Sequence, residues 1–337
     1  MDSRPNLVLF IADQWRGDVV GHMGNPAAVT PNLDRMVQTD AVSFRNAFCQ
    51  NPVSTPSRCS FMSGWYPHVH GHRTMTHMLR PHEPMLLKTL KDAGYYVFWD
   101  GRNDTVPAQN GFEPFCNEVY QPLTLSGLRK LSHGAPGSKP NYSFYIGRQE
   151  KEPGQAYPPG PDWGWVMGAI EFLQRLPTDR PFCLYLSVVF PHPPYGVEEP
   201  WYSQIDRKQL PPRIPSPDWS NKPSMLKGIA SLQGLQDWSE ERWNELRATY
   251  YGMCARIDHQ LGLVMDALRR SGHYDDTAVF VFSDHGDYTG DYGIVEKNQN
   301  TFEDCLTRVP FVIKPPASVP VKPRICNALV ELIDMPA

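Results

Sequence analysis

The sequence predicts a doubly wound α/β fold, in which helices cover both faces of a large, mostly parallel sheet. Short apolar runs such as Asn6–Ala12 lack the polar alternation of half-exposed strands, which is typical of strands buried on both faces. Segments with apolar residues at helical spacing separate these runs, as βαβ units require. Polar clusters directly follow several of the runs. Since ligands of open α/β sheets bind outside the carboxyl ends of the strands, we expect a ligand crevice there.

Five apolar runs have the length and composition of buried strands. None of them reaches the roughly 20 residues that a membrane-spanning helix needs, so no membrane partner is expected. The five predicted strands are Asn6–Ala12, Tyr95–Trp99, Phe182–Phe190, Thr277–Phe282 and Val309–Ile313.

The longest predicted helix begins after Ser239, a good N-cap residue that two glutamates follow, and it ends near Gly272. Apolar residues recur in this helix at steps of three and four, from Leu246 to Leu268. Shorter helices are predicted over Pro31–Thr39, Leu86–Ala93 and Trp163–Leu176.

Two long stretches, residues 107–161 and 198–238, are irregular and rich in proline, serine and aromatic residues. They hold too few apolar residues in a periodic pattern to form a core of their own. We therefore expect one catalytic domain over residues 1–337, with the two stretches as insertions at the rim of the ligand pocket.

The composition excludes several classes of protein. A hydrophobic content of 41% and a charged content of 20% are ordinary for a globular protein, and a net charge of −4 gives no reason to expect nucleic acid as a partner. Seven cysteines without regular spacing argue against a disulfide framework. The start, MDSRPNLVLF, lacks the regions of a signal peptide, so we expect a cytoplasmic location, or a periplasmic or exported one if a signal peptide was removed.

The segment Asn51–Gly64 (NPVSTPSRCSFMSG) reads as a short loop followed by a helix of one or two turns. Pro56 suits the first turn of a helix, and Gly64 suits the position after its end. The helix start offers free N–H groups and the positive end of the helix dipole, so Ser54 would face a place that favours anions, with Arg58 one turn away. The alternative is an N-capping loop on an ordinary surface helix.

Two polar doublets follow predicted strands of matching type: Asp13-Gln14 after the first and Asp284-His285 after the fourth. Together they could hold one divalent cation. Ca²⁺ is the expected ion because most of these ligands are oxygens, although His285 also admits Mn²⁺ or Zn²⁺. Taken one at a time, each aspartate could instead be a capping or turn residue.

The pentapeptide from Ser54 to Arg58, with the Met-Ser-Gly that follows it, resembles the sulfatase signature (Cys or Ser)-x-Pro-x-Arg. The resemblance implies an alkaline-phosphatase-like α/β/α sandwich and a sulfuric ester hydrolase. It also implies that Ser54 is oxidised to formylglycine, whose hydrated gem-diol is the nucleophile. Serine at this position resembles bacterial sulfatases that a sulfatase-maturating enzyme of the anaerobic radical type modifies. The same resemblance assigns Asp13, Gln14, Asp284 and His285 to the metal.

Further residues match the family's anion-binding positions. Lys297 matches a lysine that contacts the sulfuryl oxygens and the leaving group, and His192 in Pro-His-Pro-Pro matches a histidine that binds the same anion. Without the resemblance, a lone lysine is usually solvated and a lone histidine is usually structural. Where many sulfatases have Gly-Lys-x-His, this sequence has Gly101-Arg102-Asn103-Asp104. Arg102 could replace the lysine and grip an anion bidentately, but Asp104 brings a negative charge in place of the histidine.

The expected function is metal-dependent hydrolysis of a sulfate monoester, either a sulfated sugar or an aryl sulfate. Two alternatives stay open: a phosphonate monoester or phosphodiester hydrolase of the same superfamily, and a catalytically silent binding protein on this scaffold. The last residues, 330–336, resemble the family's lead-in to a further helix and a small C-terminal subdomain. We expect that subdomain to be absent or truncated here.

Overall fold

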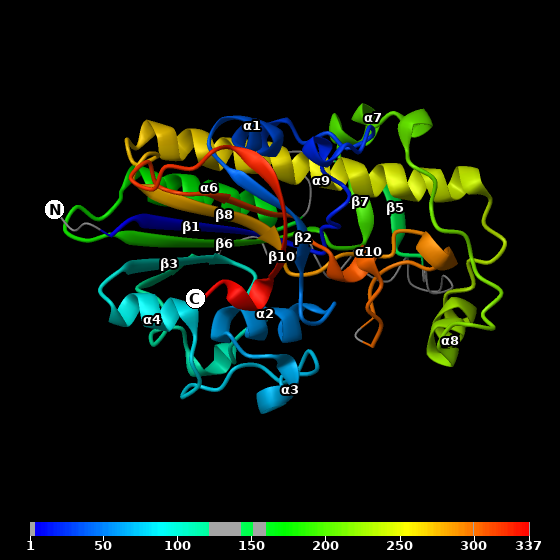
Figure 1. Ribbon diagram of the computed structural model, residues 1–337, viewed down its shortest axis with the longest axis horizontal. Coiled ribbons are helices and arrows are strands. Elements are labelled where there is room, and N and C mark those ends of the chain that lie inside the picture. The colour runs from blue at the N-terminus through cyan, green and yellow to red at the C-terminus, as the bar shows by residue number, and fades with distance from the viewer. Residues whose placement is uncertain (1–3, 121–142, 151–159, 299, 337) are drawn as a thin grey trace.

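An eight-stranded sheet forms the centre of the computed structural model, which describes residues 4–120, 143–150, 160–298 and 300–336 (Figure 1). The strand order is β10-β2-β9-β8-β1-β6-β3-β4, and neighbours run parallel except where β9 pairs with β8 and β2. This arrangement confirms the predicted α/β class. The strands are β1 (Asn6–Asp13), β2 (Val42–Phe48), β3 (Tyr96–Gly101), β4 (Glu118–Tyr120), β6 (Phe182–Pro191), β8 (Thr277–Ser283), β9 (Phe311–Lys314) and β10 (Arg324–Glu331).

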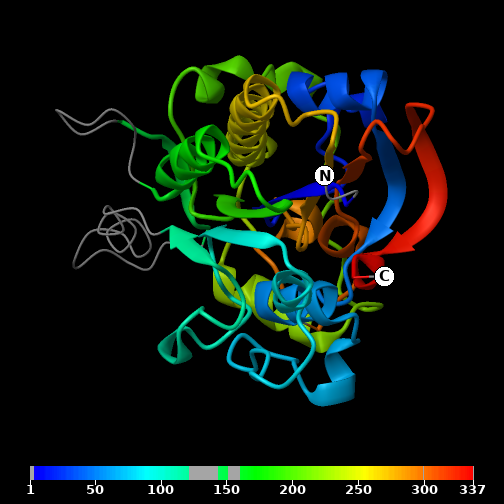
Figure 2. The same cartoon turned by 90° about the vertical axis from the view of Figure 1, so that its left-hand side faces the viewer.

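Helices cover both faces of the sheet, as Figures 1 and 2 show. One layer holds α1 (Pro31–Thr39), α6 (Asp162–Gln174) and the 31-residue α9 (Glu240–Arg270), and the other holds α2 (Ser54–Ser63), α3 (Pro67–His70) and α4 (Leu86–Asp92). Ser239 caps α9 as expected, because its side chain accepts a hydrogen bond from the Arg242 N–H. A two-stranded sheet of β5 (Tyr145–Arg148) and β7 (Tyr195–Val197) lies against α9.

Shorter elements complete the described chain. The α-helices among them are α7 (Trp201–Gln204), α8 (Ser224–Gln233) and α10 (Asp304–Thr307). The 3-10 turns are Gly21–Met23, Ala108–Asn110, Arg207–Gln209, Asp291–Gly293 and Leu332–Asp334.

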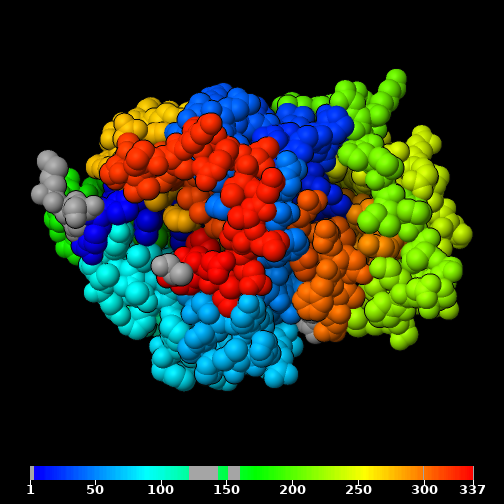
Figure 3. Space-filling view, viewed as in Figure 1, coloured from blue at the N-terminus to red at the C-terminus, as the bar shows by residue number. Residues whose placement is uncertain are grey.

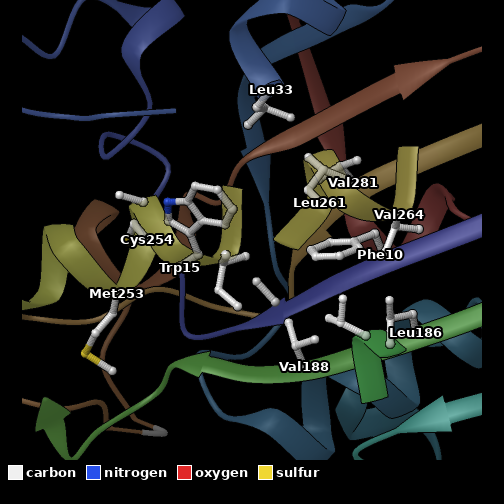
Figure 4. Packing of buried hydrophobic residues seen from close by; sticks show 14 of the residues in the cluster. Phe10, Trp15, Leu33, Leu186, Val188, Met253, Cys254, Leu261, Val264 and Val281 are labelled. Atoms are coloured by element: carbon white, nitrogen blue, oxygen red, sulfur yellow. The ribbon is translucent and has the colours of Figure 1, made fainter. Parts of the chain in front are cut away.

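Strand β1 lies in the middle of the sheet, between β8 and β6. Its successive side chains point alternately into two hydrophobic cores, one on each face of the sheet. Val8 and Phe10 pack into the core under α1, α6 and α9, whereas Leu9 and Ile11 pack into the core on the side of α2 and α4. Figure 4 shows Phe10 beside Leu261 on α9. Burial on both faces explains why the run is apolar at every position.

The structure differs from the sequence prediction in the outer part of the sheet. Strand β2 was not predicted, because only the short apolar patch at its start stands out from a polar sequence. The run predicted as Val309–Ile313 forms β9, which starts at Phe311 and is antiparallel. The chain end forms β10 and a 3-10 turn, neither of which was predicted.

The structure describes the whole of the second irregular stretch but only part of the first. In the first, residues 121–142 and 151–159 lie outside the described residues. The second contains α7 and α8 and packs beside the loop that follows β8, where the Gln233 side chain donates to the carbonyl of Val295 at 2.9 Å. Figure 3 shows these segments, in yellow-green and orange, side by side on one face. Among the described residues, no helix is both long enough and apolar enough to cross a membrane.

A buried aspartate fastens α1 to α9. Asp258 on α9 accepts hydrogen bonds from the backbone N–H groups of Asn32 at 3.0 Å and Leu33 at 2.8 Å, which are among the unpaired donors of the first turn of α1. A carboxylate from another helix thus serves as the N-terminal cap of α1.

We expect Asp258→Ala to lower the free energy of unfolding by about 2 kcal/mol, because buried donors lose their acceptor. Urea unfolding followed by circular dichroism measures the loss. Asp258→Asn is the matched control and should lose less, since its amide oxygen can still accept one bond. An alanine variant as stable as wild type would contradict this capping role.

Candidate active site

The ends of β1 and β8 bring the two predicted metal doublets together. The parallel register pairs Ala12 with Ser283, so the next residues, Asp13 and Asp284, lie side by side at the carboxyl edge of the sheet. The Gln14 N–H donates to the carboxylate of Asp284 at 3.1 Å, and both aspartates are fully buried. The two doublets therefore lie at the edge of the sheet where the strand pattern predicts a ligand site.

Ser54 is the first residue of α2 and lies against this pair of doublets. The helix begins at Ser54 with Val53 as N-cap, so Pro56 lies in its first turn as predicted, and the Ser54 hydroxyl lies at the positive end of the helix. Its Oγ lies 3.1 Å from Nε2 of His285 and 3.4 Å from each carboxylate oxygen of Asp13. Gly64 ends the helix in the left-handed conformation, as expected.

Arg58 lies one turn along α2, and its guanidinium is completely buried. It donates to Asp284 through Nε at 2.9 Å, to Asp13 through Nη2 at 3.3 Å, and to the hydroxyl of Ser187 through Nη1 at 2.6 Å. Burial disfavours the charged guanidinium, but Asp284, Asp13 and other groups outweigh it and raise the pKa of Arg58. The guanidinium therefore stays charged and joins α2 to three strands.

The donors at this centre fit a divalent cation. One ligand atom each from Asp13, Asp284 and His285 lie within 4.8 Å of one another, and all three residues are buried. Nδ1 of His285 lies 2.9 Å from the carbonyl of Gly286, so it carries the proton and Nε2 keeps a free lone pair toward Ser54. Two carboxylates and a neutral imidazole are a typical set of ligands for such an ion.

Asp13 remains ionised despite its burial. Burial alone would raise the pKa of this carboxyl, but the guanidinium groups of Arg102 and Arg58 hold its pKa well below the usual range. Nη1 of Arg102 donates to Asp13 at 2.6 Å. The ionised carboxylate is thus available to a cation.

Lys297 lies at the other side of the crevice, and its ammonium has three partners. It donates to Oε1 of Gln14 at 2.8 Å, to Nε2 of His192 at 2.9 Å and to Glu296 at 2.7 Å. Nδ1 of His192 lies 2.6 Å from the carbonyl of Pro193 and carries its proton, so Nε2 can accept. Burial and Lys297 lower the pKa of His192 to about 3, and the imidazole is therefore neutral.

The residues of this cluster differ in exposure to solvent. The side chains of Asp13, Arg58 and His285 are completely buried, whereas those of Arg102 and His192 are each 22% exposed. Arg102 is also paired with Asp104, the residue that stands in place of the usual histidine. The exposed side of the cluster thus carries a guanidinium, which donates hydrogen bonds, and an imidazole, which accepts one from Lys297.

The predicted site residues all join one continuous cluster, although their roles are still predictions. Two residues that contact this cluster were not predicted from the sequence. Ser187 is a serine within the apolar strand β6, and this interruption of the apolar pattern could have identified it. Glu296, whose carboxylate contacts Lys297, gives no such signal, because a glutamate in a polar loop is ordinary.

The fold and this cluster fit an α/β hydrolase whose carboxylates and imidazole could hold a divalent cation beside a helix N-terminus. The chain matches the Sulfatase family model over residues 5–337. It is 28% identical to an arylsulfatase of Clostridium perfringens, over 98% of this chain and 73% of that protein. It is also 27% identical to an ulvan-active sulfatase of Formosa agariphila, over 99% of this chain and 60% of that protein.

Solved structures agree with these sequence comparisons. The phosphonate monoester hydrolase of Agrobacterium radiobacter has a TM-score of 0.79 and 25% identity, covering 98% of this chain and 72% of that one. The chain therefore belongs to the sulfatase family, has its alkaline-phosphatase-like fold, and is a sulfuric ester hydrolase, as the signature around Ser54 predicted.

Replacing Arg58 tests the electrostatics of the centre. We expect Arg58→Met to lower the free energy of unfolding of the metal-free protein by about 3–5 kcal/mol, because two buried carboxylates lose their counter-charge. The same variant should bind Ca²⁺ or Mn²⁺ more tightly than wild type, since a competing positive charge is gone. Unfolding with and without the ion and titration calorimetry measure both effects.

The matched control is Arg256→Met, which removes another buried guanidinium, one paired with Glu198 instead of the metal carboxylates. It should destabilise the protein without raising its affinity for the cation. Weaker cation binding by Arg58→Met than by wild type would contradict the arrangement described above.

Proposed function

We propose that this protein hydrolyses sulfate monoesters with a formylglycine made from Ser54. The observation that carries the proposal is the position of the Ser54 hydroxyl, buried at the start of α2 and in contact with both Asp13 and His285. A nucleophile at this position lies next to the ligands of a cation and also at the positive end of a helix.

The proposed reaction has two steps. One hydroxyl of the hydrated aldehyde attacks sulfur, the S–O bond to the leaving group breaks, and the departing alkoxide takes up a proton to give the alcohol. The second hydroxyl then loses its proton, its C–O bond becomes a carbonyl, and sulfate departs. Water rehydrates the aldehyde. Unmodified serine would lack the second step, because its sulfate ester has no neighbouring hydroxyl to expel sulfate.

The surrounding residues hold charge and protons in this scheme. When bound to Asp13, Asp284 and His285, the cation supplies Lewis-acid stabilisation of negative charge on oxygen. Lys297 and Arg102 stabilise the sulfuryl oxygens as charge shifts toward the leaving group. His192 is neutral and accepts from Lys297, so it orients the ammonium.

A sulfated saccharide is the proposed substrate class. An ulvan-active sulfatase and a Delta 4,5-hexuronate-2-O-sulfatase of Bacteroides thetaiotaomicron are among the relatives, which supports a sugar sulfate over a simple aryl sulfate. The insertion at 198–238 packs beside the loop that carries Lys297, so we expect its aromatic side chains to help line the specificity pocket.

The second candidate is a phosphonate monoester hydrolase, which the structural likeness to the Agrobacterium enzyme favours. We expect aryl sulfate to be hydrolysed with a higher kcat/KM than the matched aryl phosphate and aryl phosphonate monoesters. A panel of p-nitrophenyl esters at one pH and one cation concentration tests this directly. A preference for phosphorus by orders of magnitude would overturn the sulfatase assignment.

Maturation of Ser54 gives a further prediction. We expect protein made without a sulfatase-maturating enzyme to keep plain Ser54, to bind its cation, and to turn over sulfate esters hardly at all. Co-expression of the anaerobic type of maturase, acting in the cytoplasm before any export, should switch activity on. The measurement is the mass of the peptide that spans Ser54, paired with activity; equal turnover by both forms contradicts the formylglycine mechanism.

A further inference from the structure

Strand β6 bulges just before it reaches His192. Ile11 of β1 pairs with Ser187 of β6, and Asp13 pairs with Pro191, so β6 contains two more residues than β1 over the same stretch. Two residues of β6 therefore have no counterpart in β1. Their backbone N–H groups need acceptors from outside the sheet, because unpaired backbone donors are costly inside a protein.

The carboxylate of Asp162 supplies these acceptors. Its Oδ1 accepts from the N–H of Val189 at 2.7 Å, and its Oδ2 accepts from the N–H of Phe190 at 3.0 Å. Asp162 is the first residue of α6 and is buried. The carbonyl of Val189 in turn accepts from the backbone N–H of His192 at 3.0 Å. Asp162 thus holds the backbone of His192 through a single intervening residue.

The other end of the His192 loop is tied to the next residue of α6. Glu198 follows β7 at the end of this loop, and its Oε1 accepts from Nε1 of Trp163 at 3.1 Å. Both Glu198 and Trp163 are buried. Two consecutive residues at the start of α6 therefore hold the loop, Asp162 where it begins and Trp163 where it ends.

Arg256 on α9 lies between these two attachments. Its Nε lies 3.1 Å from Oε1 of Glu198, and its Nη1 lies 3.8 Å from Oδ2 of Asp162. Its guanidinium carbon also lies 4.2 Å from the centre of the Phe190 ring. Because all these charged side chains are buried, salt in the solvent screens their attraction only weakly. One planar cation thus fixes two carboxylates and an aromatic ring relative to each other.

We propose that Asp162 is a positioning residue for the reaction, which acts by holding the backbone of His192, and that Arg256 keeps the two ends of the His192 loop together. The inference rests on the proposed function above, in which His192 orients Lys297. Asp162 and Arg256 are not among the proposed ligands of the cation, so the cation can bind without breaking the bonds that they make.

A double-mutant cycle separates positioning from general stability. Asp162→Asn keeps the shape of the side chain but replaces one oxygen with an N–H₂ group, which cannot accept from the bulge. His192→Ala removes the side chain that Asp162 positions. If Asp162 acts through His192, its substitution matters for activity only while the imidazole is present.

We expect Asp162→Asn to lower kcat/KM about tenfold when His192 is present, because small misplacements of a group at the site have effects of at least this size. In the His192→Ala background, the same substitution should lower kcat/KM by less than about twofold. A structural role alone predicts equal losses in the two backgrounds. Equal losses, or no loss when His192 is present, would overturn the proposal.

Asp258→Asn is the matched control, because Asp258 is another buried aspartate whose carboxylate accepts from two backbone N–H groups. The groups that it holds belong to the start of α1 and not to the His192 loop. Its effect on kcat/KM should be the same with and without the imidazole. If its effect depends on His192 as strongly as that of Asp162→Asn, the coupling reports stability and the proposal fails.

Arg256→Lys tests the second part of the proposal with the charge retained. A lysine can pair with one carboxylate, but it lacks the planar guanidinium that lies over Phe190. We expect kcat/KM to fall about tenfold, again only while His192 is present. A fall of the same size in the His192→Ala background would overturn the role of Arg256.

Backbone hydrogen exchange gives a readout that does not depend on turnover. Peptides from residues 186–198 should exchange faster in Asp162→Asn than in wild type, whereas peptides from β8 should not; unchanged exchange over 186–198 overturns the proposal. The kinetic cycle uses whichever p-nitrophenyl ester of the panel above is hydrolysed best. If that ester is a phosphonate, the proposed function fails, while the cycle and the exchange rates still decide the role of Asp162.

Discussion

The guanidinium of Arg58 lies between two carboxylates that would otherwise repel each other inside the protein. Asp13 and Asp284 come from neighbouring strands, and Arg58 comes from the helix that also carries Ser54. Removing both carboxylates from water is costly unless each is paired and hydrogen-bonded. The pairing therefore sets the distance between α2 and the sheet, and the position of the Ser54 hydroxyl follows from it. Ser187 adds a third strand to the same anchor.

The central strands were predictable from the sequence because burial on both faces leaves a local signal. The runs that form β1, β6 and β8 are apolar at consecutive positions, which is the pattern of strands in the interior of a parallel sheet. Strand β2 has mixed burial, with polar residues in its second half, so only its pairing with β9 and β10 identifies it. The antiparallel direction of β9 is a property of the topology and leaves no mark on a four-residue run.

The site divides in the same way between local and distant determinants. Asp13 and Asp284 were predictable because each ends an apolar strand, and Ser54 because a helix start follows it. The hydrogen bond from the Gln14 amide to Asp287 was not, since the two residues are 273 positions apart in the chain. Lys297 and His192 have weak sequence signals without the family resemblance, because their contact joins two loops. The sequence pattern thus identifies the side chains at strand ends. The contacts that loop residues make with them are found only in the structure.

Charge explains why this crevice needs a cation to hold an anionic ester. Three side chains near Ser54 are cationic, and five carboxylates lie among them. The groups in this count are Arg58, Arg102 and Lys297 on one side and Asp13, Asp104, Asp284, Asp287 and Glu296 on the other. With every carboxylate ionised, these groups have two negative charges in excess, which repel a sulfate ester. A divalent ion at the buried end cancels that excess, so the ester can then approach the exposed side, where Arg102 and His192 lie. Occupancy of the metal site and binding of substrate are consequently coupled by electrostatics, before any chemistry occurs.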